Sequence, residues 1–248
     1  MHVINRLLSF IGLHLIKNKF IITIPREFSR TYNHNLAELK RSPGEFNIIK
    51  SLTYDPGIHP ESHIDYECEF TANHINRLNP KNILDIGSYR IFVIGMLSHF
   101  KVTTIDVRYR RPISNNENVI TSDAKKLTIP DNSFDVVTSL CALEHFGLGR
   151  YGDDFDMDAD KHAFAEMVRV LKPGGHLIFT TTVTRVAPSI LFNAHRIYSQ
   201  QMLRKFCDGL ICKEENYYSK NIGRLCSFDE VTAEPNRWDV YCGCWQKK

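Results

Sequence analysis

A glutamate and a histidine, Glu144 and His145, directly follow an apolar run in the middle of the chain. An imidazole with a pKa near ~6.5 exchanges its proton around neutral pH, which suits a general base. We therefore predict that His145 is a catalytic base and that Glu144 is its partner or a second ligand of the substrate. Glutamate and histidine also occur at the rims of pockets and at helix ends without a catalytic role, so the pair alone does not define a reaction.

The segment after this pair contains the glycines Gly147, Gly149 and Gly152, which leave its backbone free to close over a bound molecule. A later segment carries a neighbouring histidine and arginine. Both segments follow predicted strands, so we expect them on the same rim of a sheet. The predicted substrate-binding residues are Arg150, Tyr151, Asp153, His195 and Arg196.

Acidic residues end three successive apolar runs. Asp85 and Gly87 end the first, and Asp106 ends the second, at the spacing of about 20 residues that suits a carboxylate bound to ribose hydroxyls. Asp123 follows the third run, where it can accept a hydrogen bond from an exocyclic amine, and the backbone N–H of Ala124 can meet a ring nitrogen. The carboxyl ends of strands in open α/β sheets bind ligands, so these residues predict a cofactor that contains a nucleoside.

The first of these turns lacks the glycines that cradle a pyrophosphate. Gly87 is followed by Ser88, Tyr89 and Arg90, and the next glycine is Gly95. A full G-x-G-x-x-G pattern is therefore absent, which argues against NAD and FAD. The chain also has no Tyr-x-x-x-Lys pair. A nicotinamide-dependent oxidoreductase remains the weaker alternative.

Helical and extended patterns alternate through most of the chain. This alternation predicts an α/β fold with a doubly wound, mostly parallel, seven-stranded sheet and helices on both faces. A stretch without a helix before the last strand allows an antiparallel hairpin at the edge. We expect helices near 61–79, 91–99, 160–171 and 197–207, and strands near 82–86, 102–106, 119–121, 134–140, 176–182, 210–218 and 238–244.

We divide the chain into an N-terminal helical extension and cap, residues 1–60, and a main domain, residues 61–248. Apolar residues recur at helical spacing within residues 1–24, with basic residues nearby. The stretch is too short and too interrupted to span a bilayer. Either it lies on a membrane surface as a peripheral helix, or it packs on the main domain or on a second subunit.

Composition excludes several other classes of function. The net charge of the 248 residues is only +3, and no basic block occurs, so nucleic acid is not an expected partner. The 7 cysteines are scattered without a Cys-x-x-Cys pair, which favours reduced thiols in a cytoplasmic protein over a zinc site. The acidic run at residues 153–160 lacks the glycine and glutamate of a calcium loop, so we expect no metal.

Five segments in order resemble the class I S-adenosylmethionine-dependent methyltransferases, over about residues 64–185. The resemblance implies a Rossmann-like methyltransferase fold with S-adenosyl-L-methionine as the cofactor. It also implies that Asp85, Gly87 and Ser88 line the methionine end, Asp106 binds the ribose, Asp123 and Ala124 bind the adenine, and Leu140 and Cys141 close the pocket. The matching segments are Leu-Asp-Ile-Gly at 84–87, Ile-Asp at 105–106, Asp-Ala at 123–124, Ile-Pro-Asp-Asn-Ser-Phe-Asp-Val-Val at 129–137 and Val-Leu-Lys-Pro-Gly-Gly-His-Leu-Ile at 170–178.

Residues 145–153 and 192–198 also resemble a bacterial subfamily of unknown substrate that is linked to surface-polysaccharide and glycan assembly. We therefore expect methyl transfer to a small-molecule or glycan acceptor, at oxygen. The expected location is the cytoplasm or the inner face of the membrane. The altered first turn keeps one rival open, a degenerate member of the fold that binds a partner and catalyses nothing.

Overall fold

The structure, a computed structural model, describes residues 24–42, 44–45, 47–54 and 61–248. The chain divides into two compact units, residues 1–60 and 61–248. In the first unit, helix α2 (Arg26–Arg41) begins after Pro25 and carries basic residues in its last turn, where they complement the helix dipole. The predicted amphipathic helix in residues 1–24 falls almost wholly outside the described residues.

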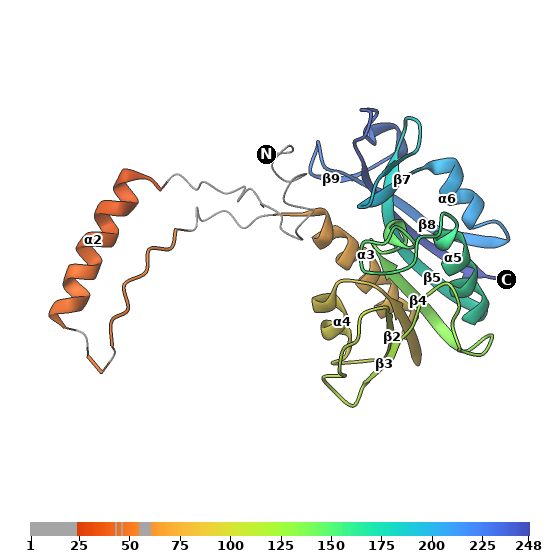
Figure 1. The fold of residues 1–248 in the computed structure, drawn as a ribbon, viewed down its shortest axis with the longest axis horizontal. Helices are drawn as coiled ribbons and strands as arrows, with labels where there is room; N and C mark the ends of the chain where they lie inside the picture. The colour runs from red at the N-terminus through yellow and green to blue at the C-terminus, as the bar shows by residue number, and fades with distance from the viewer. Residues whose placement is uncertain (1–23, 43, 46, 55–60) are drawn as a thin grey trace. The chain divides into compact units, whose positions relative to one another are not determined.

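The second unit is built on one twisted sheet (Figure 1). The strand order is β3-β2-β1-β4-β5-β10-β8-β9, with β7 beside β5 and β6 beside β7. The first five strands in the chain pair in parallel, and β10 lies antiparallel between β5 and β8. The strands are β1 (Asn82–Ile86), β2 (Lys101–Asp106), β3 (Glu117–Thr121), β4 (Phe134–Leu140), β5 (Leu171–Thr184), β6 (Ser189–Leu191), β7 (His195–Ser199), β8 (Leu210–Ser219), β9 (Arg224–Cys226) and β10 (Asp239–Lys247).

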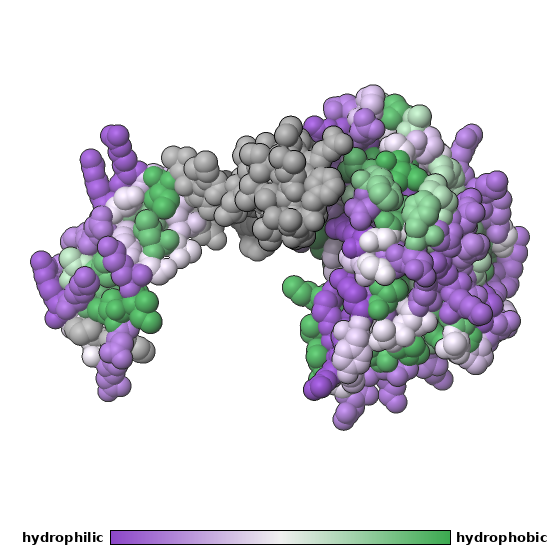
Figure 2. Space-filling model, viewed as in Figure 1, coloured by the Kyte–Doolittle hydropathy of each residue, from purple (hydrophilic) through white to green (hydrophobic). Residues whose placement is uncertain are grey.

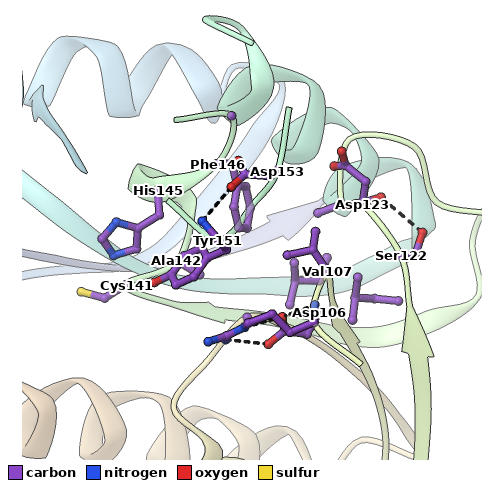
Figure 3. A pocket seen from close by; sticks show the side chains of 16 residues that line it. Asp106, Val107, Ser122, Asp123, Cys141, Ala142, His145, Phe146, Tyr151 and Asp153 are labelled. Atoms are coloured by element: carbon purple, nitrogen blue, oxygen red, sulfur yellow. Dashed lines mark hydrogen bonds and ion pairs between the residues drawn. The ribbon is translucent and has the colours of Figure 1, made fainter. Parts of the chain in front are cut away.

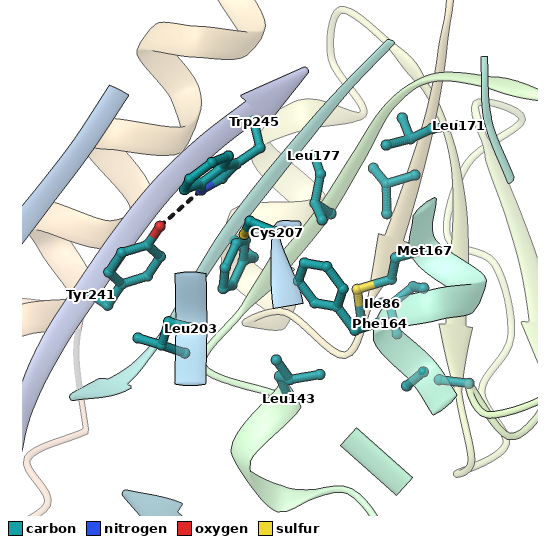
Figure 4. Close-up of a cluster of buried hydrophobic side chains, with 14 of the residues drawn as sticks. Ile86, Leu143, Phe164, Met167, Leu171, Leu177, Leu203, Cys207, Tyr241 and Trp245 are labelled. Atoms are coloured by element: carbon teal, nitrogen blue, oxygen red, sulfur yellow. Dashed lines mark hydrogen bonds between the residues drawn. The ribbon is translucent and has the colours of Figure 1, made fainter. Parts of the chain in front are cut away.

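Helices cover both faces of the sheet, as predicted. Helices α3 (His63–Leu78) and α4 (Arg90–Met96) contribute to one buried apolar cluster, and α5 (Ala159–Val170) and α6 (Gln200–Phe206) contribute to another. Successive strand residues point to opposite faces, so Ile83 joins the first cluster and Leu84 joins the second. Figure 4 shows the second cluster, in which Phe164 and Met167 of α5 pack near Leu177. The predicted doubly wound, mostly parallel fold is confirmed, but the sheet of the described residues has 10 strands and not the seven that we expected.

The largest difference from the predicted elements lies in residues 195–199, of which 197–199 were expected to begin a helix. They form β7, because they pair with β6 on one side and with the end of β5 on the other. Helix α6 starts only at Gln200, after Ser199, whose side chain accepts a hydrogen bond from Met202 N at 3.3 Å. This N-cap marks the change from strand to helix.

Strand β8 was predicted, and with the 3-residue strand β9 it forms the antiparallel hairpin that the sequence allowed at the edge of the sheet. The β6–β7 pair was not predicted, and β6 has only 3 residues. Strand β10 is antiparallel to both of its neighbours, but it lies between β5 and β8 and not at the edge of the sheet. Hydrophilic side chains cover most of the face of this unit in Figure 2, with hydrophobic side chains in smaller patches. No helix among the described residues is long and apolar enough to cross a membrane.

Candidate active site

A cavity with two adjoining parts lies at the carboxyl ends of β1, β2 and β4 (Figure 3). Apolar side chains form much of the first part, and arginines and histidines form much of the second. Residues of both parts include Gly87, Asp106, Arg108, Cys141, His145 and Tyr151. The first part adds Val107, Asp123, Ala124, Phe146 and Asp153, and the second adds His63, Ser88, Tyr89, Arg90, Arg110, Leu140, Glu144, Arg150, His195 and Trp238.

The first turn is tight even though it has few glycines. Gly87 has a φ of +74°, and a Cβ atom there would lie 2.9 Å from the Cβ of Ala142. Only glycine allows the chain to pass this close without strain. Next to it, the hydroxyl of Ser88 accepts a hydrogen bond from Leu140 N at 3.0 Å. Ser88 therefore ties the altered turn to the end of β4.

Asp85 lies beneath this turn and outside the residues that line the cavity. Its side chain is buried and accepts hydrogen bonds from Ser88 N at 3.3 Å and from the Thr138 hydroxyl at 2.8 Å. Burial raises the pKa of Asp85 to about 6. We expected Asp85 to line the methionine end of a cofactor, and the structure instead gives it the role of supporting the turn.

Asp106, at the end of β2, is held by the guanidinium of Arg108. Arg108 Nε donates to Oδ1 at 3.0 Å and Nη2 donates to Oδ2 at 2.8 Å, and Figure 3 shows the contact. Burial acts to raise the pKa of Asp106, but the hydrogen bonds from Arg108 hold it below its usual value. The backbone N–H of Arg108 also donates to Oδ1 at 2.9 Å. A carboxylate offers about four lone-pair sites, so ionised Asp106 keeps room for one hydroxyl, and binding both hydroxyls of a diol would require Arg108 to give up a hydrogen bond.

Asp123 and Ala124 follow β3 at the far end of the first part of the cavity. The Asp123 side chain is 45% exposed and lies 3.4 Å from Lys125 Nζ. Ala124 is buried, and together with Val107 and Phe146 it forms an apolar slot. Such a slot, with one carboxylate at its edge, fits a planar base that carries an amino group.

Cys141, at the end of β4, has a φ of +43°, which is uncommon for a residue other than glycine. Its backbone N–H donates to the Thr180 hydroxyl at 3.0 Å, and that hydroxyl donates to the carboxylate of Glu67. Strained backbone of this kind persists only where the surroundings hold it in place. Leu140 and Cys141 thus form a fixed floor for the second part of the cavity.

Glu144 and His145 lie on the short helix η2 (Leu143–His145), and the structure changes their expected roles. His145 Nδ1 lies 2.6 Å from the Ala194 carbonyl, so Nδ1 carries the proton and Nε2 has the free lone pair. Burial lowers the pKa of His145 to about 4. Burial raises the pKa of Glu144 to about 7, and its Oε2 accepts a hydrogen bond from Thr181 at 2.9 Å. Glu144, rather than His145, can take up a proton near neutral pH.

Three of the predicted substrate-binding residues surround the second part of the cavity. Arg150 Nη1 donates to the Ala194 carbonyl at 3.2 Å, beside His145. The Arg150 guanidinium lies 5.4 Å from the centre of the Tyr151 ring, and that of Arg108 lies 4.7 Å from it. His195 and His145 rings are 6.1 Å apart. The loop after η2 and the start of β7 therefore meet at the second part of the cavity.

The other two predicted residues organise a loop. Asp153 borders the first part of the cavity, and its carboxylate accepts hydrogen bonds from Tyr151 N at 3.0 Å and Gly149 N at 3.4 Å. Arg196 is buried and lies outside the cavity, where it donates to the Phe146 carbonyl at 2.6 Å. We expected Arg196 on the substrate, and the structure instead assigns it to fixing the glycine-containing loop.

The sequence analysis missed several residues of the cavity, among them Arg108 and Arg110. It also missed His63 of α3 and Trp238, just before β10, which line the second part with their rings 5.5 Å apart although they are far apart in the sequence.

Glu67 of α3 lies behind Cys141 with no exposed surface, and burial raises its pKa to about 7. Glu67 lies on the buried face of α3 together with Phe70 and Ile75, but Thr71 and His74 are also buried there, so hydrophobic periodicity gave no clear signal.

Comparisons with known proteins agree with this geometry. Residues 84–179 match the family model described as a methyltransferase domain. The crystal structure of the Burkholderia thailandensis 1,6-didemethyltoxoflavin-N1-methyltransferase, with bound S-adenosylhomocysteine, has a TM-score of 0.57 and 12% identity over 95% of this chain and 98% of that chain. The cyclase SpnF has a TM-score of 0.54 and 19% identity over 73% and 80% of the two chains.

Curated relatives match the same region. The ubiquinone/menaquinone biosynthesis C-methyltransferase UbiE of Shewanella halifaxensis is 35% identical over 106 residues, which are 43% of this chain and 37% of that protein. The same enzyme of Pseudomonas paraeruginosa is 35% identical over 91 residues, 37% of this chain and 31% of that protein. This chain thus spans about a third of the length of these relatives. It has a Rossmann-like methyltransferase fold, and residues 84–179 are similar to a methyltransferase domain.

Proposed function

We propose that this chain transfers a methyl group from S-adenosyl-L-methionine to a hydroxyl oxygen of a small-molecule or glycan acceptor. The observation that carries the proposal is the single cavity in which Gly87, Asp106 and Ala124 adjoin Glu144 and the rim residue Arg150. Binding groups for a nucleoside and a proton acceptor thus border one space. The match of residues 84–179 to a methyltransferase domain supports the same reaction.

The residues of the cavity fit this cofactor. The apolar slot at Ala124 and Phe146 would hold the adenine, and Asp106 would accept hydrogen bonds from the ribose. The turn at Gly87 and Ser88 would face the amino-acid end. When bound, the cofactor supplies an electrophilic methyl group on a sulfonium sulfur.

The chain's own contribution is proton removal and orientation. Glu144 accepts the proton of the acceptor hydroxyl as the oxygen attacks, and the hydrogen bond from Thr181 holds its carboxylate in place. The His145 ring, anchored on Ala194, stays neutral and forms one wall. Holding the acceptor oxygen in line with the methyl group supplies several kcal/mol of rate enhancement.

A carbon acceptor is the second candidate, because the matching curated relatives are named C-methyltransferases. An acidic carbon also loses a proton during methylation, so Glu144 would serve either reaction. Transfer of a carbon-13 methyl group, followed by NMR of the product, distinguishes an O-methyl from a C-methyl group.

The first test is calorimetric titration with S-adenosylhomocysteine, with NADH in parallel. We expect micromolar binding of S-adenosylhomocysteine and its loss in Asp106→Ala. Binding of NADH instead would favour the oxidoreductase. Binding of neither would favour the partner-binding alternative. Because a cyclase shares this fold, labelled methyl transfer to a panel of sugar and phenol hydroxyls must then establish turnover.

We also propose a cytoplasmic protein in peripheral contact with the inner face of the membrane through residues 1–24. Several large hydrophobic residues are exposed on segments that follow the carboxyl ends of strands, and they support contact with an apolar surface. They include Ile91, Tyr109, Phe155 and Phe192. Flotation with liposomes, compared between the full chain and one that starts at Pro25, tests the contribution of residues 1–24. Equal flotation of the two chains would show that residues 1–24 do not contribute to membrane binding.

A further inference from the structure

Four arginines line the second part of the cavity: Arg90, Arg108, Arg110 and Arg150. They come from the start of α4, from the loop after β2 and from the loop after η2. Clustered guanidinium groups repel one another unless anions balance them. The carboxylates around them therefore decide whether this part of the cavity is already neutralised.

Glu117 makes its side-chain hydrogen bonds with Arg90. Both of its oxygens accept hydrogen bonds from the Arg90 guanidinium, with Nη2 to Oε2 at 2.9 Å, and Oε2 also accepts one from Ile113 N at 3.1 Å. The Glu117 side chain has no exposed surface. Hydrogen bonds from Arg90 hold the pKa of Glu117 below its usual value, so it stays ionised.

Arg110 forms an ion pair with Glu117, but its side chain donates no hydrogen bond to any of the described residues. Its Nη2 lies 3.6 Å from Glu117 Oε1, which is too long for a hydrogen bond. Its Nε is buried and has no partner within the described residues. A guanidinium carries five N–H donors, and buried donors are nearly always paired in folded proteins.

The other two arginines have only one carboxylate partner among the described residues. Arg108 already uses Asp106, and no carboxylate of the described residues forms an ion pair with Arg150. The imidazole of His195 also borders this part of the cavity, and its Nε2 is buried without a partner. The space therefore presents unpaired polar atoms and more positive than negative charge, which favours an anionic ligand group.

We propose that Arg110, with Arg90 beside it, forms a binding subsite for a carboxylate or phosphate group in the second part of the cavity. Planar guanidinium groups bind such anions through two parallel hydrogen bonds. The anion could come from two sources. The first is the carboxylate at the amino-acid end of the cofactor, and for this source the proposal rests on the proposed function. The second is an anionic group on the acceptor.

Calorimetry with two nucleosides separates these sources. S-adenosylhomocysteine carries the amino-acid end, and methylthioadenosine lacks it. If the cofactor supplies the anion, Arg110→Gln weakens S-adenosylhomocysteine by about 10- to 100-fold and leaves methylthioadenosine unchanged. The unchanged nucleoside also shows that the variant is folded. Arg77→Gln is the matched control, because Arg77 lies in the last turn of α3 and does not line the cavity. We expect it to leave the affinities for S-adenosylhomocysteine and methylthioadenosine unchanged.

Inorganic phosphate tests the acceptor as the source. We expect a saturable change in Trp238 fluorescence when phosphate is added to the protein saturated with S-adenosylhomocysteine, and its loss in Arg110→Gln. Unchanged S-adenosylhomocysteine affinity in Arg110→Gln, together with no response to phosphate, would overturn the subsite. If neither nucleoside binds the unmodified protein, the proposed function fails. The subsite is then tested by adding phosphate to the free protein, where a saturable fluorescence change that is lost in Arg110→Gln supports it and no change overturns it.

Discussion

Glu144 Oε1 and His145 Nε2 lie 3.9 Å apart, and burial moves the pKa values of the two side chains in opposite directions. The pKa of Glu144 rises to about 7 and that of His145 falls to about 4. At neutral pH the histidine is thus neutral and the glutamate exchanges its proton. This difference is the reason we propose Glu144 as the proton acceptor, although histidine is the usual base at neutral pH.

Replacing Glu144 with glutamine should reduce turnover by about 100-fold or more, because an amide takes up no proton. Turnover of the unmodified enzyme should rise with pH through about 7, as the carboxyl group ionises, and the variant should lose this rise. Labelled methyl transfer over the pH range measures both effects. The amide can still accept the hydrogen bond from Thr181, so calorimetry should give an unchanged S-adenosylhomocysteine affinity.

Asp154→Asn, which removes an exposed carboxylate from the same loop region, is the control and should keep both turnover and pH profile. A Glu144→Gln enzyme that keeps the rise near pH 7 would refute this assignment. Weakened cofactor binding in that variant would instead point to a structural role for Glu144.

His145 should stay neutral well below the usual range of histidine. Its Nδ1 donates to the Ala194 carbonyl, and burial disfavours the imidazolium ion, so protonation of Nε2 should occur only near pH 4. Nitrogen-15 NMR of the labelled imidazole reports the tautomer and the titration midpoint directly. Titration near ~6.5, or a proton on Nε2 at neutral pH, would contradict the observed geometry.

The sequence placed the strands of the parallel sheet better than it placed the site. The bounds of β1 and β4 were predicted to the residue, because both faces of these strands are buried and their apolar runs end abruptly. Asp106 was found for a related reason, since the end of a strand fixes its position. Periodicity does not say which helix packs behind which strand, however, so Glu67 behind Cys141 was not found.

Substitution of Glu67 should change how stability depends on pH. Burial raises the pKa of Glu67 in the folded protein to about 7, above the value of 4.5 expected for the unfolded chain. The folded state therefore holds an extra proton between these pH values, and stability falls as pH rises through this window. The groups that face Glu67 are His63, Tyr89, Cys141, Glu144 and Thr180.

Glu67→Gln should thus weaken the pH dependence of the free energy of unfolding. At about 1.4 kcal/mol per pKa unit, the change between pH 5 and pH 8 should be at most about 3 kcal/mol. Urea denaturation at the two pH values measures it. Because Glu144 titrates in the same window, the double variant should lose more of the dependence than either single variant. An unchanged slope in Glu67→Gln would show that Glu67 is ionised in the folded protein.

The loop that carries Arg150 and Tyr151 depends on one glycine. Gly147 has a φ of +70°, and a Cβ atom there would lie 2.2 Å from the Asp156 carbonyl oxygen and 2.4 Å from the Cβ of Ala159. Gly147→Ala must therefore displace the loop from the start of α5, in addition to the cost of the left-handed backbone. We expect a loss of about 3 kcal/mol or more in the free energy of unfolding.

Gly152→Ala is the matched control, because Gly152 has a similar φ of +79° and no atom within 4 Å of its added Cβ. It should cost only about 1–2 kcal/mol, from backbone conformation alone. Gly147 also borders the apolar part of the cavity, so S-adenosylhomocysteine affinity should fall in Gly147→Ala and stay unchanged in Gly152→Ala. Equal losses of stability in the two variants would show that the loop does not pack against α5 as described.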